Sequence, residues 1–149
     1  MAIQNKQAGF TVVEMLILII IAGILAGVVS TTFNSIQSGR HNRERKNEIK
    51  LIQKSLENYY AQHEKYPSLE SINDASWFAR NIKNLSLKEI TDPQSTSAKF
   101  ASTSTKQAYS YEVKSSSGEA CNNASSDCAT YVLTANLQGE SPYVQNNYY

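Results

Sequence analysis

The stretch GFTVVEMLILIIIAGILAGVVS, Gly9 to Ser30, decides the fold of the N-terminal part of this chain. It is aliphatic almost throughout, and no formally charged residue occurs between Glu14 and Arg40. As a helix, those 25 uncharged residues would extend about 37 Å, which exceeds the roughly 30 Å hydrocarbon core of a bilayer. We therefore predict a membrane-spanning helix within residues 10–39.

Glu14 is the one acidic residue in this apolar stretch. A carboxylate at the centre of a bilayer costs about 2.5–3.5 kcal/mol on translocon scales. Glu14 is therefore a defect in the span, a residue at the edge of the membrane, or a group that needs a partner to compensate its charge.

The whole chain has 149 residues, which is enough for one modest domain and an appendage. Its 14 Lys and Arg nearly balance its 13 Asp and Glu, so the net charge does not indicate a nucleic-acid-binding protein. After Tyr60 the sequence becomes rich in Ser, Thr, Asn and Tyr.

Two cysteines, Cys121 and Cys128, are separated by six residues and have no histidine near them. This arrangement favours a disulfide over a metal site, and a disulfide indicates an oxidising compartment. A reduced pair is the alternative.

The cationic residues and the cysteines predict opposite sides of the membrane for the C-terminal domain. Only Lys6 and the amino terminus are positive before the apolar run, whereas five cationic residues follow it, so a positive-inside count would place the C-terminal domain in the cytoplasm. We follow the cysteines and expect this domain outside. The five residues are Arg40, Arg43, Arg45, Lys46 and Lys50.

The first nine residues, MAIQNKQAG, form a short polar leader. A secretory signal peptide would have a basic n-region and an A-x-A-like cleavage site after the apolar run. This leader carries a single lysine, and no clear A-x-A follows the apolar run, so ordinary signal-peptide cleavage is disfavoured.

The segment GFTVVEMLI resembles the signature of the type IV pilin and pseudopilin class, with Val12, Val13 and Met15 as apolar variants. The resemblance implies cleavage by a prepilin peptidase between Gly9 and Phe10. It also implies N-methylation of the new terminal amine. Glu14 takes the position of the glutamate that the class uses in filament assembly.

Phe10 and Glu14 lie about one helical turn apart, so a new amine on Phe10 would be close to this carboxylate. The resemblance implies that Glu14 of one copy pairs with the Phe10 amine of a neighbour in a staggered bundle. Because an unpaired buried carboxylate is costly, such pairing would favour the correct stagger. An intramolecular pair is the alternative, and the sequence does not choose between them.

Two glycines in the apolar run, Gly23 and Gly27, are four residues apart. This small-xxx-small spacing allows membrane helices to approach each other closely. The alternative is that glycine is simply common in membrane helices.

The residues after Gly39 continue with helical periodicity. We predict one long helix that continues to about His63 and is ended by Pro67. The basic cluster Arg40–Lys46 could meet anionic lipid or nucleic acid, although a solvated face that alternates with acids is favoured. The apolar face of this half is expected to consist of Ile49, Ile52, Leu56, Tyr59 and Tyr60.

Beyond this helix, residues 68–85 predict a loop with one short helix, for which Ser68 and Ser71 are candidate caps. Alternation predicts strands in AYSYEV and in TYVLTANL, with a third strand or a frayed tail in PYVQNNYY. The predicted fold is α+β, with a long N-terminal helix on a small antiparallel sheet, which is also the architecture that the pilin resemblance implies.

The sequence shows no nucleophile, metal-binding or phosphate-binding pattern, so we expect neither an enzyme nor a cofactor. His41 and His63 are expected to face solvent. The domains are predicted as leader 1–9, transmembrane and filament-core helix 10–39, and globular domain 40–149.

The expected function is a structural subunit of a surface filament. Alternatives are a pseudopilin of a type II secretion system, a membrane-anchored binding domain that does not polymerise, and nucleic-acid binding by the basic cluster. The resemblance implies several partners, namely further copies of the chain, the prepilin peptidase, a membrane assembly platform with its ATPase, minor pilins and membrane lipid.

Overall fold

The computed structural model describes residues 9–83 and 85–148, apart from the side chains of residues 29–35. The chain divides into two compact units, Met1–Gln37 and Ser38–Tyr149, each described by itself below. The leader predicted for residues 1–9 lies outside the described residues except for Gly9.

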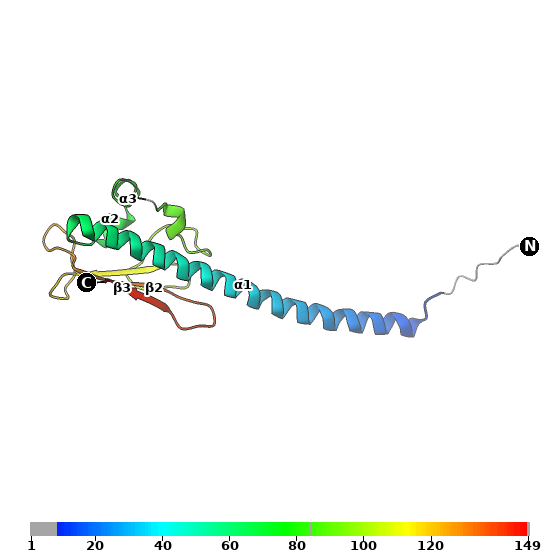
Figure 1. The fold of residues 1–149 in the computed structure, drawn as a ribbon. Helices are drawn as coiled ribbons and strands as arrows, with labels where there is room; N and C mark the ends of the chain where they lie inside the picture. The colour runs from blue at the N-terminus through cyan, green and yellow to red at the C-terminus, as the bar shows by residue number, and fades with distance from the viewer. Residues whose placement is uncertain (1–8, 84, 149) are drawn as a thin grey trace, which may run out of the picture. The chain divides into compact units, whose positions relative to one another are not determined.

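One helix, α1 (Val12–His63), accounts for 52 residues and confirms the prediction of a long helix to about His63 (Figure 1). Glu64 ends it with a left-handed backbone conformation, at a φ of 55°. The Glu64 N–H donates to the carbonyl of Tyr60 over 2.7 Å, which satisfies one of the free carbonyls of the last turn.

The second half of α1 packs on the sheet through the predicted apolar face. Ile49, Ile52 and Leu56 are at most 1 % exposed and share a core with Tyr111 and Leu133. The spacing of three to four residues places these side chains in one stripe. Tyr59 and Tyr60, also predicted on this face, are half-buried against the same core.

The same face of α1 also buries polar side chains, which the apolar pattern alone does not predict. The carboxylate of Glu57 accepts from the hydroxyls of Tyr66 at 3.0 Å and Tyr131 at 2.7 Å. The amide of Gln53 donates to the carbonyl of Asn146 at 2.7 Å. These bonds satisfy groups whose burial would otherwise be costly, and they attach the helix to the sheet.

The sheet has three antiparallel strands in the order β1-β2-β3. They are β1 (Ser110–Lys114), β2 (Thr130–Ala135) and β3 (Tyr143–Asn146), with Tyr111 opposite Leu133. The structure therefore confirms the predicted α+β fold, with a long helix packed on an antiparallel sheet. The third segment forms a strand rather than a frayed tail.

Two helices, α2 (Leu69–Asn73) and α3 (Ala75–Asn81), replace the single short helix predicted after Pro67. The prediction was wrong because Asp74 separates them. Its extended backbone ends α2, and its carboxylate caps α3 by accepting from Trp77 N at 2.6 Å.

Ser68 is the N-cap of α2, as predicted, and its hydroxyl accepts from the backbone N–H of Ser71 at 3.1 Å. Ser71 is therefore the donor in this cap and not a cap itself. A further 3-10 turn, η1 (Leu87–Ile90), was not predicted. It begins with a capping box in which Ser86 N donates to the carboxylate of Glu89 at 2.7 Å.

The loop between β1 and β2 contains the disulfide Cys121–Cys128, the pairing that the sequence predicted, with the two Cα atoms 5.3 Å apart. Cys128 is fully buried, and the backbone N–H of Tyr66 donates to its carbonyl over 2.8 Å. The loop is therefore fastened to the segment that follows α1.

Removing this disulfide should lower the free energy of unfolding by about 2.5 kcal/mol, since the unfolded chain regains the freedom of the closed loop. The change is replacement of Cys121 and Cys128 by alanine, and the measurement is a urea midpoint followed by the fluorescence of Trp77, the single tryptophan. Reducing the wild-type protein is the matched control. An unchanged midpoint in both samples would contradict the prediction.

Stability should also depend on the protonation of Glu48. Burial raises the pKa of Glu48 to about 7, although the hydrogen bond from the Tyr109 hydroxyl acts in the opposite direction. Because the folded state binds this proton more tightly than the unfolded chain, the contribution is full below about pH 4.5 and is lost as the pH rises through about 7. Urea unfolding at pH 5 and pH 7.5 measures it. In Glu48→Gln this part of the pH dependence should be absent, and an unchanged dependence would assign it to another group.

Candidate assembly site on the N-terminal helix

The first turn of α1 is closed by a capping box formed by Thr11 and Glu14. The backbone N–H and the hydroxyl of Thr11 donate to Glu14 Oε2 at 3.2 and 3.3 Å, and Glu14 N donates to Thr11 Oγ1 at 3.2 Å. Such reciprocal bonds satisfy free donors at the start of a helix, where a negative charge is also favourable. Glu14 therefore has a local role at the head of the apolar run.

The sequence reasoning missed Thr11, although its spacing from Glu14 is the T-x-x-E signal of a capping box. Both Thr11 bonds use the same carboxylate oxygen, Oε2. In the described part of the chain, no hydrogen bond reaches Glu14 Oε1. One oxygen of the carboxylate is thus available to another partner.

Phe10 precedes the helix, and its side chain is 71 % exposed. In this uncleaved chain Phe10 carries a peptide N–H and not an amine. Pairing between a Phe10 amine and Glu14, and cleavage after Gly9, therefore stay predictions.

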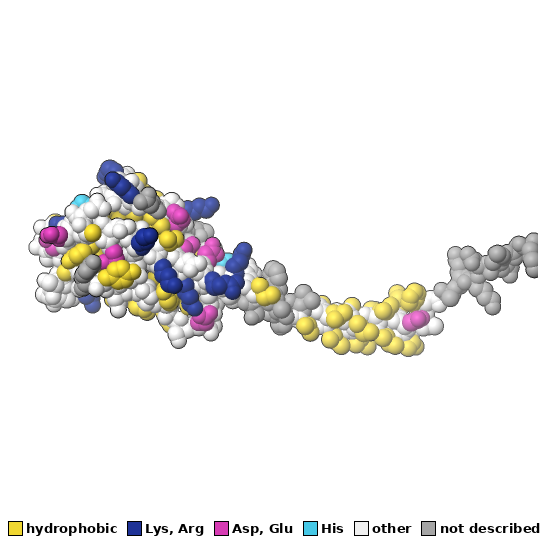
Figure 2. Space-filling view, in the orientation of Figure 1, with side chains coloured by type: hydrophobic (Ala, Val, Ile, Leu, Met, Phe, Trp, Pro, Cys, Tyr) yellow, Lys and Arg dark blue, Asp and Glu magenta, His cyan; other side chains and the backbone are white. Residues whose placement is uncertain are grey.

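The first part of α1 exposes an apolar surface on all sides. Every described side chain from residue 9 to residue 28 is exposed. The large apolar ones range from 48 % exposed at Ile21 to 78 % at Val12. Figure 2 shows them as a band of hydrophobic side chains with one acidic residue. An apolar surface of this extent indicates contact with another protein or a membrane.

Among the residues that the structure describes, no helix is both long enough and apolar enough to cross a membrane. The predicted span, residues 10–39, includes positions 29–35, whose side chains lie outside the described residues.

Gly23 and Gly27 lie within this exposed part of α1. Apart from the adjacent residues and the backbone of its own helical turn, a Cβ atom placed on either residue meets no described atom within 4 Å. Nothing within the single chain therefore requires glycine at these positions. Close packing against a helix of another molecule stays a prediction for both.

The two histidines differ in environment. The expectation that His41 faces solvent is wrong, because its side chain is only 12 % exposed and its Nδ1 lies 3.7 Å from Glu44 Oε2. His63 is exposed, and its ring lies 4.2 Å from that of Tyr59. Within the described ranges, no group of three or more His, Cys, Asp or Glu side chains could hold a metal ion.

Comparison with known proteins gives one family match. Residues 4–30 match the prokaryotic N-terminal methylation motif, and this range includes the proposed cleavage position, the capping box and both glycines. No curated protein and no solved structure matches the chain. The exposed apolar helix and its single acid thus lie within a prepilin-type N-terminal methylation motif, and this chain is consistent with the type IV pilin and pseudopilin class.

Proposed function

We propose that this chain is a structural subunit of a type IV pilus-like surface filament. In this proposal a prepilin peptidase cleaves between Gly9 and Phe10, and the new amine is methylated. The observation that carries the proposal is the exposed apolar segment of α1, headed by Glu14 and located within the methylation motif. The work of such a subunit is mechanical and not catalytic.

The apolar segment needs a cover in each state of the protein, because its exposure to water is unfavourable. We propose that lipid covers it before assembly and that the helices of other copies cover it in the filament. Gly23 and Gly27 would let those helices approach closely. The assembly platform, its ATPase and minor pilins are the further partners that the class implies.

Glu14 would select the stagger between neighbouring copies. Its Oε2 is occupied by Thr11, and its Oε1 could accept from the methylated amine of Phe10 in the next subunit. Thus the capping box would hold the carboxylate in place while the second oxygen binds the neighbour. A misplaced copy would leave the carboxylate unpaired in an apolar surrounding, which is costly.

We further propose that the globular unit lies outside the cell membrane and is displayed on the filament. The disulfide Cys121–Cys128 supports this orientation, since such bonds persist in oxidising compartments. The cationic residues that follow the apolar run would then be outside as well, against the positive-inside count.

The experiment is a measurement of intact mass and abundance for this protein in material sheared from its native cells. An abundant product that starts at Phe10, with one methyl group and the disulfide, would support the filament subunit. Mature protein confined to the membrane would favour a secretion pseudopilin. A full-length chain beginning at Met1 in the membrane would contradict both and favour an anchored domain that does not polymerise.

A further inference from the structure

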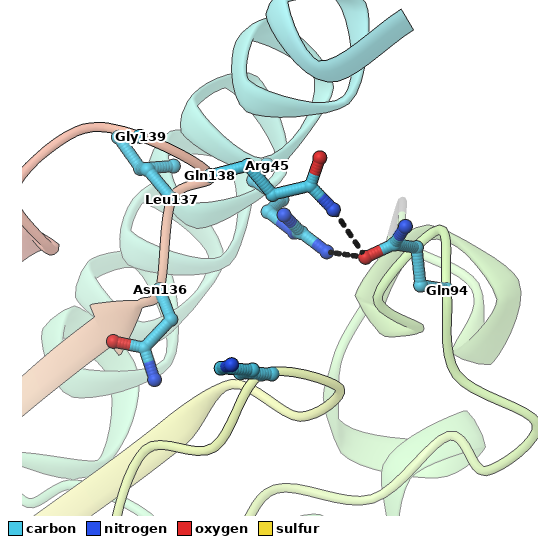
Figure 3. Close-up of a pocket in the computed structure, with 7 residues that line it drawn as sticks. Arg45, Gln94, Asn136, Leu137, Gln138 and Gly139 are labelled. Atoms are coloured by element: carbon cyan, nitrogen blue, oxygen red, sulfur yellow. Dashed lines mark hydrogen bonds between the residues drawn. The ribbon is translucent and has the colours of Figure 1, made fainter. Parts of the chain in front are cut away.

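A cavity of about 350 Å³ opens beside the second half of α1 (Figure 3). Its walls come from α1, from the segment after η1 and from the loop of residues 136–139 that follows β2. This volume is at the lower end of the range for small-molecule sites. The lining combines apolar surface with polar groups, which include Arg45, Lys106, Asn136 and Gln138.

Arg45 is the buried charged group in the wall, since its side chain is only 1 % exposed. Its Nε donates to Asp92 Oδ2 at 2.7 Å, and its Nη2 donates to Asp92 Oδ1 and to Gln94 Oε1, both at 2.9 Å. These bonds use three of the five guanidinium donors. No protein atom of the described residues accepts from the remaining nitrogen, Nη1. Two donors of a buried cation are therefore left for a ligand.

The wall is held in place by a chain of hydrogen bonds. Gln94 Oε1 accepts from Arg45 and also from Gln138 Nε2 at 2.8 Å, and Figure 3 shows both side chains reaching it. The backbone of Gln138 is bonded to Asn42 on α1 in both directions, at 2.9 Å each. Because these groups are fixed before any ligand arrives, little ordering is needed on binding.

The charges of the cavity favour an anion. Asp92 neutralises Arg45, and Glu140, next to the lining residue Gly139, is paired with Lys46 at 2.6 Å. Lys106 makes no ion pair with any described carboxylate and adds a positive charge to the wall. The carboxyl of Glu48 also acts on Arg45, and its pKa of about 7 keeps it partly neutral near neutral pH. The side-chain amide of Asn136 makes no hydrogen bond in the described part of the structure. It can therefore donate to, or accept from, hydroxyl groups of a ligand.

We propose that this cavity binds a carboxylate. Its oxygens accept from Arg45 Nη1 and from the ammonium of Lys106, because charge-assisted bonds of this type are the strongest available there. The carboxylate comes from one of two sources. It belongs to an acidic sugar, whose hydroxyls bond to Asn136 and Gln138, or to an acidic side chain of another copy of this chain. This proposal does not depend on filament formation.

The test uses the full ¹⁵N-labelled chain in detergent micelles, titrated at constant ionic strength with glucuronate, acetate and glucose. Saturable shifts of the backbone amides of residues 136–139 with glucuronate are expected, and none with glucose. Loss of one charge-assisted bond in Lys106→Ala should weaken the binding about tenfold. Lys99→Ala, an exposed lysine outside the cavity, is the matched control and should leave it unchanged.

The two sources give different results for acetate. Binding of glucuronate much tighter than acetate identifies an acidic sugar, whereas equal binding identifies a bare carboxylate such as an acidic side chain. The proposal is overturned if glucuronate gives no saturable shift, if glucose gives the same shifts, or if Lys99→Ala weakens binding as much as Lys106→Ala.

Discussion

Replacing Glu14 with glutamine is expected to lower the yield of assembled filament about a hundredfold or more. Breaking a buried charge pair by removing one partner costs about 3–5 kcal/mol, and every 1.4 kcal/mol corresponds to a factor of ten. In the proposed filament the loss recurs at every subunit. The measurement is the amount of this protein in sheared material, relative to the amount of processed protein in the membrane.

Glutamine is the sharper substitution because it keeps the capping box, in which Gln can replace Glu. It therefore removes the charge of Glu14 and leaves the bonds with Thr11 possible. Thr11→Val is the matched control, since it removes the hydroxyl that caps the helix and keeps the charge. This control should lower helix stability by about 0.5–2 kcal/mol and still yield filaments.

Two results would contradict this account of Glu14. If Glu14→Gln assembles as well as the wild type, pairing of its charge does not drive assembly. If Thr11→Val abolishes filaments while Glu14→Gln does not, the function of Glu14 is confined to the capping box. Processing after Gly9 is checked in each variant, because an uncleaved chain has no Phe10 amine.

Replacing Asp92 with alanine is expected to lower the free energy of unfolding by about 3–5 kcal/mol, which is a large part of the stability of a small domain. Asp92 and Arg45 are 3 % and 1 % exposed and are joined by two bonds of 2.7 and 2.9 Å. Without Asp92, the guanidinium remains buried and loses its main compensation. Urea unfolding of the full chain, followed by Trp77 fluorescence, measures the change.

Glu140→Gln is the matched control for this prediction. It weakens the ion pair between Lys46 and Glu140, whose side chains are 35 % and 47 % exposed. Because solvent screens the attraction between two such exposed groups, the pair should contribute little to stability. If Asp92→Ala costs no more than Glu140→Gln, the buried pair does not hold the end of η1 against α1.

Local patterns in the sequence predicted the elements of the fold well. The 3.6-residue periodicity of Ile49, Ile52 and Leu56 placed the buried face of α1 correctly, because side chains so spaced share one side of a helix. The alternation around Tyr111 and Leu133 placed β1 and β2 for the equivalent reason in strands. The third strand was predicted only as one of two alternatives, and the division between α2 and α3 was not predicted, since short segments carry weak signals.

The functional features also fall into two groups, those that local sequence patterns predicted and those that only the folded chain creates. The N-terminal motif depends on residues within a few positions of each other, so the sequence by itself determined the motif and the long helix that contains its apolar run. The cavity beside Arg45 could not be predicted, because Asp92, Lys106 and Gln138 come from segments far apart in the chain. Only the tertiary structure decided that the basic cluster after Gly39 contains one buried cation, held by a carboxylate 47 positions away. Charge and hydropathy along a chain predict which side chains prefer water, whereas the pairing that permits a charge to be buried depends on contacts that folding creates.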